Sequence, residues 1–299
     1  LPSRLAKYED MYDTEIEGGK SKFRQVDREK SLQSLMTSNL LKRLESSVHS
    51  FRLTLQKLQG KYDGILSIIQ DYNDGLITDK SFSSALANED IDDEDLENIS
   101  ETFIGDNIKI NLADMDVKSW EYDLKNDLKL VEFLLEEMHK ITPEHDFKLQ
   151  DIKSHIDNKI KNPINPGNKK VIVFTAFADT ADYLYEHISE YIQDEHYLHS
   201  AKVTGSKNTT TANGSYDFQS ILTLFSPKSK DKDVLMPDDA NEIDILIGTD
   251  CISEGQNLQD CDYLINYDIH WNPVRIIQRF GRIDRIGSVN ESIQLVNYW

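Results

Sequence analysis

Three arginines and a glutamine near the C-terminal end of the chain form a row that could bind phosphate. They recur at steps of three, four and three residues, so on a helix they would share one face; they are Arg275, Gln278, Arg282 and Arg285. A guanidinium group suits phosphate because it can donate two parallel hydrogen bonds to it. The alternative is an ordinary amphipathic helix with a solvated basic face.

A helix over residues 273–283 is expected to position this row. Asn272 is a typical N-terminal cap, and Pro273 suits the first helical position. The side opposite the row is apolar and would be buried; it consists of Ile276, Ile277, Phe280 and Ile283.

Small or hydroxyl-bearing residues stand at the ends of three segments of strand length. In a parallel sheet the carboxyl ends of the strands meet at one edge, where ligands bind. Small residues there let the backbone approach a phosphate, although tight turns are the plainer explanation of each one alone. The segments are residues 171–175, ending in Thr175; 201–204, ending in Thr204 before Gly205; and 243–247, followed by Gly248, Thr249 and Asp250.

Strands and helices alternate over residues 168–299. Further strands are expected at 263–267 and 293–298, and helices at about 180–193 and 218–225. This alternation predicts an α/β fold, with a parallel sheet sandwiched by helices that form its crossovers. Residues 206–241 include a polar, turn-rich insert.

Residues 1–162 are predicted to form a separate helical region. Apolar residues recur at three- and four-residue steps over 31–69, which indicates one amphipathic helix or two in sequence, and again over 116–140. Between them, residues 74–113 are expected to form a polar, acidic loop. Thr142 and Pro143 are typical of the start of a third helix, which would bury Phe147, Leu149, Ile152 and Ile156. Residues 162–167, rich in Asn and Pro, would end it as a linker.

Five segments follow one another in the order and at the spacing of motifs V and VI of superfamily 2 helicases. They are residues 245–250 (ILIGTD), 253–259 (SEGQNLQ), 265–268 (INYD), 271–273 (WNP) and 278–287 (QRFGRIDRIG). The Trp-Asn-Pro element and the Arg-Ile-Gly ending resemble the Swi/Snf-type branch, and within it bacterial proteins similar to RapA (HepA), the RNA-polymerase-recycling ATPase. Residues 171–184 look like motif IV and its helix. Residues 40–47 resemble, more weakly, the helical lead-in of such enzymes.

This resemblance implies a second RecA-like lobe, with motifs IV to VI, of an ATP-dependent motor. Arg282 and Arg285 match the two motif VI arginines that reach the nucleotide, and Gln278 matches the residue that opens this motif. Nucleotide contacts are also implied in motif V, at Glu254, Gly255 and Asn257. A nucleic-acid track is implied at the strand ends, at Thr175, Thr204, Gly205 and Thr249. Gln256 stands where the resemblance leads us to expect an aliphatic residue of motif V. This departure affects the expected packing of the motif, not the family resemblance.

Half of a nucleotide site is missing from the sequence. Phosphoryl transfer needs a phosphate cradle and a metal held by an acid, and the cradle signature is GxxxxGK[ST]. The only GKS is Gly19-Lys20-Ser21, where Thr14 replaces the first glycine, and no acidic pair follows an apolar strand in residues 1–167. Because the chain begins at Leu1, we expect it to be a piece of a longer protein. ATP with Mg²⁺ would then be held mainly by an N-terminal RecA-like lobe, and the isolated piece would be inactive.

The composition indicates the cellular location and the kinds of partner to expect. No apolar run approaches the roughly 20 residues of a membrane helix, no signal peptide is recognisable, and two cysteines with no ligand pattern indicate a reduced, cytoplasmic protein. The net charge of −20 argues against nucleic acid at first sight. However, acidity is concentrated in residues 88–97, where seven of ten positions are acidic, and such a run is usually a solvated loop or a partner-binding tail.

The prediction is a C-terminal motor lobe of a nucleic-acid translocase or helicase, with duplex DNA as the expected partner. One alternative is a helicase subunit of a phage-defence or restriction system. Another is a degenerate lobe that serves as a binding module. RNA polymerase or defence-system subunits are further candidate partners.

Overall fold

The computed structural model describes residues 14–15, 22–23, 25–76, 114–205, 207–252, 255–270 and 272–298. The chain separates into two compact units, each described by itself. The first comprises Leu1–Leu44 and Phe51–Lys140, and the second comprises Glu45–Ser50 and Ile141–Trp299. The predicted division at residues 162–168 differs from this partition, because residues 45–50 and 141–161 belong to the second unit.

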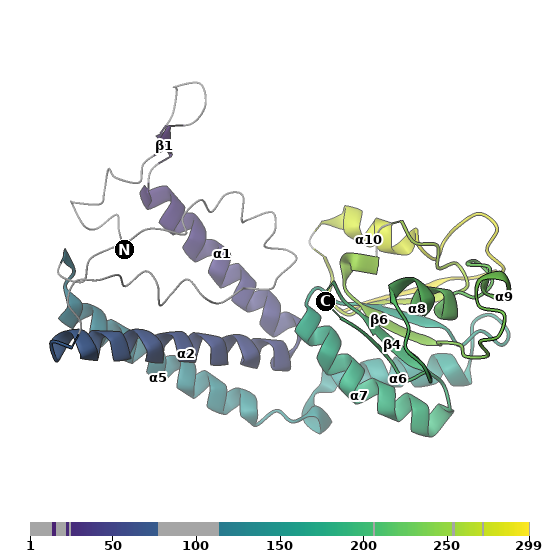
Figure 1. The fold of residues 1–299 in the computed structure, drawn as a ribbon, viewed down its shortest axis with the longest axis horizontal. Coiled ribbons are helices and arrows are strands. Elements are labelled where there is room, and N and C mark those ends of the chain that lie inside the picture. Colours follow the sequence, from purple (N-terminus) through teal and green to yellow (C-terminus); the bar gives the residue numbers. More distant parts are fainter. Residues whose placement is uncertain are drawn as a thin grey trace. The chain divides into compact units, whose positions relative to one another are not determined.

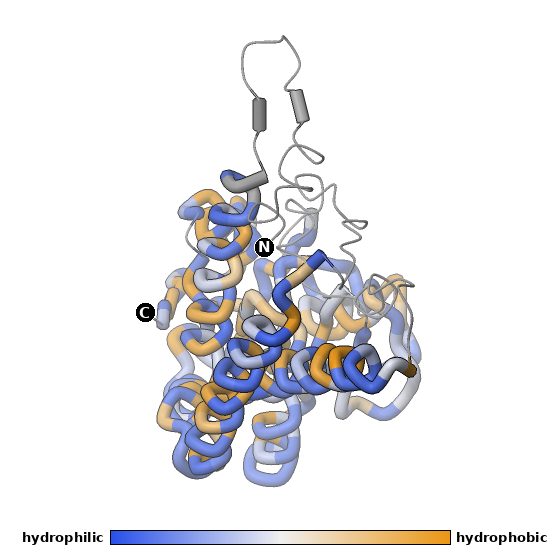
Figure 2. Tube along the Cα trace, turned by 90° about the vertical axis from the view of Figure 1, so that its left-hand side faces the viewer, coloured by the Kyte–Doolittle hydropathy of each residue, from blue (hydrophilic) through white to orange (hydrophobic). Residues whose placement is uncertain are grey.

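The described part of the first unit is mainly helical (Figure 1). It contains α1 (Gln25–Ser46), α2 (Val48–Asn73) and α5 (Val117–His139), besides a short antiparallel pair of β1 (Thr14–Glu15) and β2 (Lys22–Phe23). The region predicted over 31–69 is therefore two helices. Hydrophobic and hydrophilic residues alternate along the helices (Figure 2), as amphipathic packing requires. Their shared core consists of Phe51, Leu55, Val131 and Leu135.

Serine and aspartate caps set the helix boundaries in this half of the chain. The Ser47 hydroxyl accepts a hydrogen bond from the Ser50 amide at 2.9 Å, so Ser47 alone separates the end of α1 from the start of α2. Asp116 caps α5 by accepting from the Ser119 amide at 3.2 Å and the Ser119 hydroxyl at 2.7 Å, and these bonds lower the pKa of the Asp116 carboxyl. The acidic loop predicted over 74–113 lies, from residue 77 on, outside the described residues.

The second unit is an α/β layer, which confirms the predicted fold class. Its six-stranded sheet has the order β5-β4-β6-β3-β7-β8, and all neighbours are parallel except β4 and β5. The strands are β3 (Val171–Phe174), β4 (Ser200–Val203), β5 (Asn208–Thr210), β6 (Ile245–Gly248), β7 (Tyr263–Asn266) and β8 (Gln294–Asn297). The short edge strand β5 was not predicted, because its polar sequence has no apolar alternation.

Helices cover both faces of this sheet (Figure 1). On one face, α6 (Phe147–Lys161) and α7 (Ala178–His196) pack on alternate strand residues such as Val171 and Val173. On the other face, α8 (Phe218–Phe225) packs on the intervening residues, such as Ile172 and Phe174. Both faces of the central strands are thus buried, which explains their continuous apolar sequences.

The start of α6 corrects the predicted third helix. Pro143–His145 form only a 3-10 turn (η4), and the helix begins at Phe147, because Asp146 rather than Thr142 supplies the cap by accepting from the Leu149 amide at 3.1 Å. Phe147 is exposed, whereas the other predicted core residues of this helix are fully buried: Leu149, Ile152 and Ile156.

Two short helices and α10 complete the second unit. Within the polar insert lies α9 (Lys232–Leu235), and η5 (Asp250–Ile252) follows β6. The helix predicted over residues 273–283 is α10 (Pro273–Phe280), capped by the Asn272 side chain, which accepts from the Val274 amide at 3.0 Å. No helix among the described residues is long and apolar enough to cross a membrane.

Candidate nucleotide and nucleic-acid site

The parallel register brings the predicted strand-end residues to one edge of the sheet. Phe174 and Val203 both pair with Gly248, so β3, β6 and β4 end at the same level. Across this edge the Thr175 amide donates to the Gly248 carbonyl at 3.0 Å, and the Thr249 amide donates to the Val203 carbonyl at 3.3 Å. The juxtaposition expected from the sequence is therefore present.

The hydroxyl groups at this edge are used inside the protein. Thr175 is fully buried and donates to Asp268 Oδ2 at 2.6 Å. Thr204 is buried and donates to the Lys207 carbonyl at 3.0 Å. Thr249 is buried as well, with its hydroxyl 3.4 Å from the sulfur of Cys251. Gly205 is exposed. Nucleic-acid contact at these four positions stays a prediction, and it would involve main-chain atoms more than these threonine side chains.

The motif V segment lies beside this edge. Gly255 is exposed, with a backbone φ of +70° that favours glycine. The side-chain oxygen of Asn257 is buried and has no hydrogen-bond partner among the described residues. Gln256, the unexpected residue, accepts a hydrogen bond from Lys230 at 2.9 Å, so it packs toward the polar insert. Glu254 lies outside the described residues.

Motif VI is arranged differently from the predicted continuous helix. Because α10 ends at Phe280, Arg282 and Arg285 follow it in turns. The Arg282 carbonyl accepts from the Leu258 amide at 3.0 Å, which holds the motif V and motif VI segments side by side. Arg285 is exposed and donates through Nε to the Gly281 carbonyl at 3.1 Å, and Gln278 is half-buried. The predicted nucleotide residues are thus on adjacent segments.

The buried side of α10 also differs from the prediction. Ile277 is 67% exposed, whereas Arg279 is fully buried. Arg279 donates through Nε to Asp250 at 2.7 Å, and through Nη1 to the Asn266 side chain at 3.0 Å and the Asp268 carbonyl at 3.2 Å. It therefore ties α10 to the ends of β6 and β7. The sequence held one signal for it, because Arg279 lies between Ile276 and Ile283 at helical spacing.

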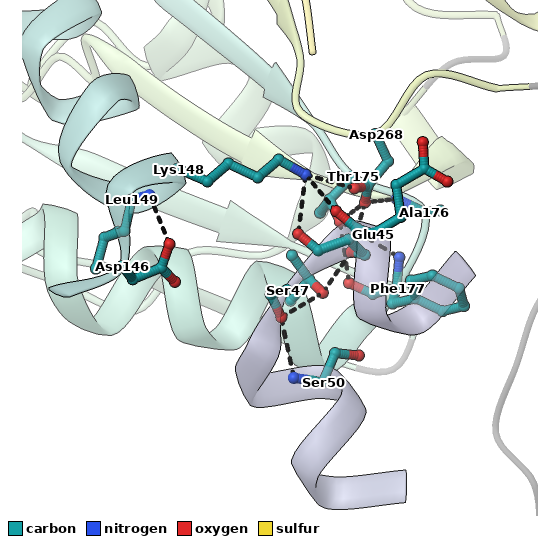
Figure 3. Close-up of polar contacts among 12 residues, drawn as sticks. Glu45, Ser47, Ser50, Asp146, Lys148, Leu149, Thr175, Ala176, Phe177 and Asp268 are labelled. Carbon is teal, nitrogen blue, oxygen red and sulfur yellow. Dashed lines mark hydrogen bonds and ion pairs between the residues drawn. The ribbon is translucent and has the colours of Figure 1, made fainter. Parts of the chain in front are cut away.

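Asp268 is a second residue that sequence reasoning passed over. It lies two residues after the end of β7, and its Oδ2 atom accepts hydrogen bonds from the Thr175 hydroxyl at 2.6 Å and the Ala176 amide at 2.9 Å (Figure 3). It thereby joins the ends of the adjacent strands β3 and β7. Within the described part of the chain, no group of three or more His, Cys, Asp and Glu side chains could hold a metal ion.

The comparisons with known proteins fall on the same region. Residues 155–287 match the model of the helicase conserved C-terminal domain. An uncharacterized ATP-dependent helicase of Bacillus subtilis, YqhH, is 54% identical over 46 residues, which are 15% of this chain and 8% of the relative. The RNA polymerase-associated protein RapA of Pectobacterium atrosepticum is 43% identical over 54 residues, 18% of this chain and 6% of the relative.

A solved structure, the C-terminal part of the Fun30 ATPase domain, is 18% identical with a TM-score of 0.36 and covers 59% of this chain and 53% of that chain. The segments matched in YqhH and RapA are each less than a tenth of that relative's own length.

Residues 155–287 thus match the helicase conserved C-terminal domain, and a relative that shares a segment with this chain is named as an ATP-dependent helicase. The matched range includes the strand ends of β3, β4, β6 and β7, the motif V segment and α10. The predicted helicase class is confirmed to this extent. Its placement among RapA-like Swi/Snf-type enzymes stays a proposal, because the match to RapA covers only 54 residues.

Proposed function

We propose that this chain supplies the C-terminal motor lobe of an ATP-dependent translocase or helicase that acts on nucleic acid, with duplex DNA as the substrate. The observation that supports it best is the backbone hydrogen bond between Leu258 and Arg282, which places the motif V and motif VI segments side by side at the carboxyl edge of the sheet. Ligands bind at this edge in parallel α/β sheets.

In the proposed mechanism, ATP is bound between this lobe and an N-terminal lobe that holds the phosphates and Mg²⁺. Catalysis of phosphoryl transfer is mainly positioning and charge stabilisation. Closure of the two lobes would bring Arg282 and Arg285 to the γ-phosphate, and their guanidinium groups would stabilise the charge that develops on its oxygens. Opening would release the phosphate, and repeated cycles would move the lobes along one strand.

Arg282 and Arg285 suit this role for different reasons. Arg285 is exposed and donates through Nε to the Gly281 carbonyl, four residues before it, so its outer nitrogens can reorient. Arg282 is held through its main chain, which fixes where its side chain begins. RNA polymerase, with which the RapA relative is associated by name, is a candidate partner.

The test is the replacement of each arginine by alanine in the full-length protein. ATP turnover is expected to fall by about 10³ to 10⁵, the contribution of arginine fingers to phosphoryl transfer. Nucleic-acid affinity is expected to change by less than about threefold, and the melting temperature by a few degrees at most. Lys129→Ala, an exposed change on α5, is the control.

Two results would contradict this assignment. Turnover that survives within about threefold would show that the arginines are not needed for the chemical step. Affinity for nucleic acid that collapses together with turnover would show that the row binds nucleic acid instead.

A further inference from the structure

The junction between α1 and α2 is built of buried serines. Ser46, Ser47 and Ser50 are exposed by only 1%, 3% and 0%, although none is apolar. The residues Glu45–Ser50 belong to the second compact unit, while the helices on either side of them belong to the first. Buried hydroxyl groups need hydrogen-bond partners, and here the α/β unit supplies them.

The junction is bonded to the first turn of α7. The Ser46 and Ser47 hydroxyls lie 2.8 and 3.2 Å from the Thr180 hydroxyl, and the Ser50 hydroxyl donates to Asp179 at 2.6 Å. The motif IV strand β3 leads directly into α7. The junction therefore contacts the segment that follows the motif IV strand.

Lys148, on α6, caps the end of α1 from outside. Its ammonium group donates to the carbonyls of Glu45 at 2.8 Å and Ser46 at 2.9 Å, and it lies 3.4 Å from Asp268 Oδ1 (Figure 3). A cation is favourable at a helix C-terminus, where carbonyls have no partner in the helix. Burial lowers the pKa of Lys148, and the Asp268 carboxylate opposes that shift. The same ammonium group lies 4.0 Å from the centre of the Tyr267 ring.

Asp268 connects this junction to α10. Its side chain accepts from the Ser46 hydroxyl at 2.8 Å, in addition to its bonds with the end of β3. Its main-chain carbonyl accepts from Arg279 at 3.2 Å. One residue thus holds the junction with its side chain and α10 with its backbone, and Arg282 follows Arg279 by three positions.

We propose that Lys148 and Asp268 are positioning residues, which couple the α1–α2 junction to the segment that contains Arg282 and Arg285. A displacement of the junction would alter the bonds of Asp268, and through them the placement of α10 and of the arginines after it. Helices α1 and α2 are covalently continuous with the junction. The expected consequence for ATP turnover rests on the proposed function, but the coupling itself does not.

The direct test is amide hydrogen exchange on the full-length protein carrying Lys148→Met. This change removes the cation from two helix-end carbonyls while keeping much of the apolar length of the side chain. Exchange is expected to accelerate by about tenfold in peptides covering residues 45–50 and also in those covering 273–285, since both report local opening. The matched control is Lys161→Met on the same helix, where an exposed lysine forms an ion pair with Asp157 one turn away.

Acceleration limited to residues 45–50 would overturn the coupling, and no acceleration in either segment would overturn the positioning role of Lys148. The peptide covering α8, which none of these contacts touches, is the internal reference. If exchange in the α8 peptide accelerates equally, the variant is opening globally. The milder change Ser46→Ala then tests the coupling. It removes only one hydroxyl, and it must accelerate both segments while leaving α8 unchanged.

ATP turnover distinguishes failure of the coupling from failure of the proposed function. In the full-length protein, Lys148→Met is expected to lower kcat by about tenfold and to leave the KM for ATP within about twofold, because Lys148 acts through other residues. If the wild type is active and the variant has the same kcat, the coupling to catalysis is contradicted. Absence of turnover in the wild type would instead contradict the proposed function, while the exchange result would still decide whether the two segments are coupled.

Discussion

Arg279 and Arg285 are six positions apart, yet they differ in every physical respect that decides their role. Arg279 is fully buried, and a buried guanidinium is tolerated only if it is paired and hydrogen-bonded. Asp250 and Asn266 supply that pairing. Arg285 is exposed, so its charge contributes little to folding and remains available to a ligand. We therefore expect Arg279 to contribute to stability, whereas the exposure of Arg285 agrees with the role proposed for it.

Replacing Arg279 by alanine is expected to lower the free energy of unfolding by about 3 kcal/mol, since removing one partner of a buried pair leaves the other partner poorly solvated. We place the value at the lower end of the usual range because the Asp250 side chain remains 20% exposed. The measurement is urea unfolding. In the same assay Arg285→Ala should stay within about 0.5 kcal/mol of the wild type. Equal effects of the two changes would contradict the distinction between them.

At the scale of the element, the glycines of α2 and the glycine at the end of β6 differ in how much space surrounds them. Gly60 and Gly64 lie on exposed positions of α2, and a Cβ added there meets nothing within 4 Å. Gly248 ends β6, and a Cβ there would lie 2.8 Å from the Val203 carbonyl oxygen and from the Ile252 side chain. The first two glycines only add entropy to the unfolded chain, whereas the third permits close approach of two strand ends.

Gly60→Ala and Gly64→Ala should therefore each stabilise the protein by about 0.5 to 1 kcal/mol, the helix preference of alanine over glycine. Gly248→Ala should destabilise it by about 1 to 3 kcal/mol, because the extra methyl group overpacks the edge. Chemical denaturation of the three variants tests both signs. A stabilising Gly248→Ala would show that the sheet edge relaxes more easily than its packing indicates.

At the scale of the whole molecule, the proposed nucleotide site has no phosphate cradle in the sequence of this chain. No GxxxxGK[ST] sequence occurs in its 299 residues. The described residues include no cluster of acids and histidines that could hold the metal. Because phosphoryl transfer needs the cradle and the metal together, the role proposed for Arg282 and Arg285 requires groups from outside this chain.

We therefore expect the 299-residue chain by itself not to hydrolyse ATP, with or without nucleic acid. The measurement is phosphate release by the purified chain, compared with a blank and with the Arg282→Ala, Arg285→Ala double variant. Release above the blank that nucleic acid stimulates and the double variant lacks would contradict this expectation. It would mean that a phosphate site without the usual signature exists in the chain.

The sequence by itself determined the parts of this protein that depend on local patterns. Continuous apolar runs predicted β3, β6 and β7, helical periodicity predicted α2, α5 and α7, and the order of motifs V and VI predicted a helicase C-terminal domain. These succeed because a strand buried on both faces and an amphipathic helix each have a characteristic residue period. The roles of Arg282 and Arg285 stay predictions from the same motifs.

Only the tertiary structure decided which residues join these elements. Ile277, which periodicity placed on the buried side, is exposed, and Arg279 is buried instead, because Asp250 and Asn266 stabilise its guanidinium group. From the sequence, Ser46 is only a polar residue in a helical pattern. In the structure, Lys148 of α6 and Asp268, which follows β7, lie beside it. Burial and hydrogen-bond partners here depend on residues 13 to 222 positions away, and a local pattern contains no information about them.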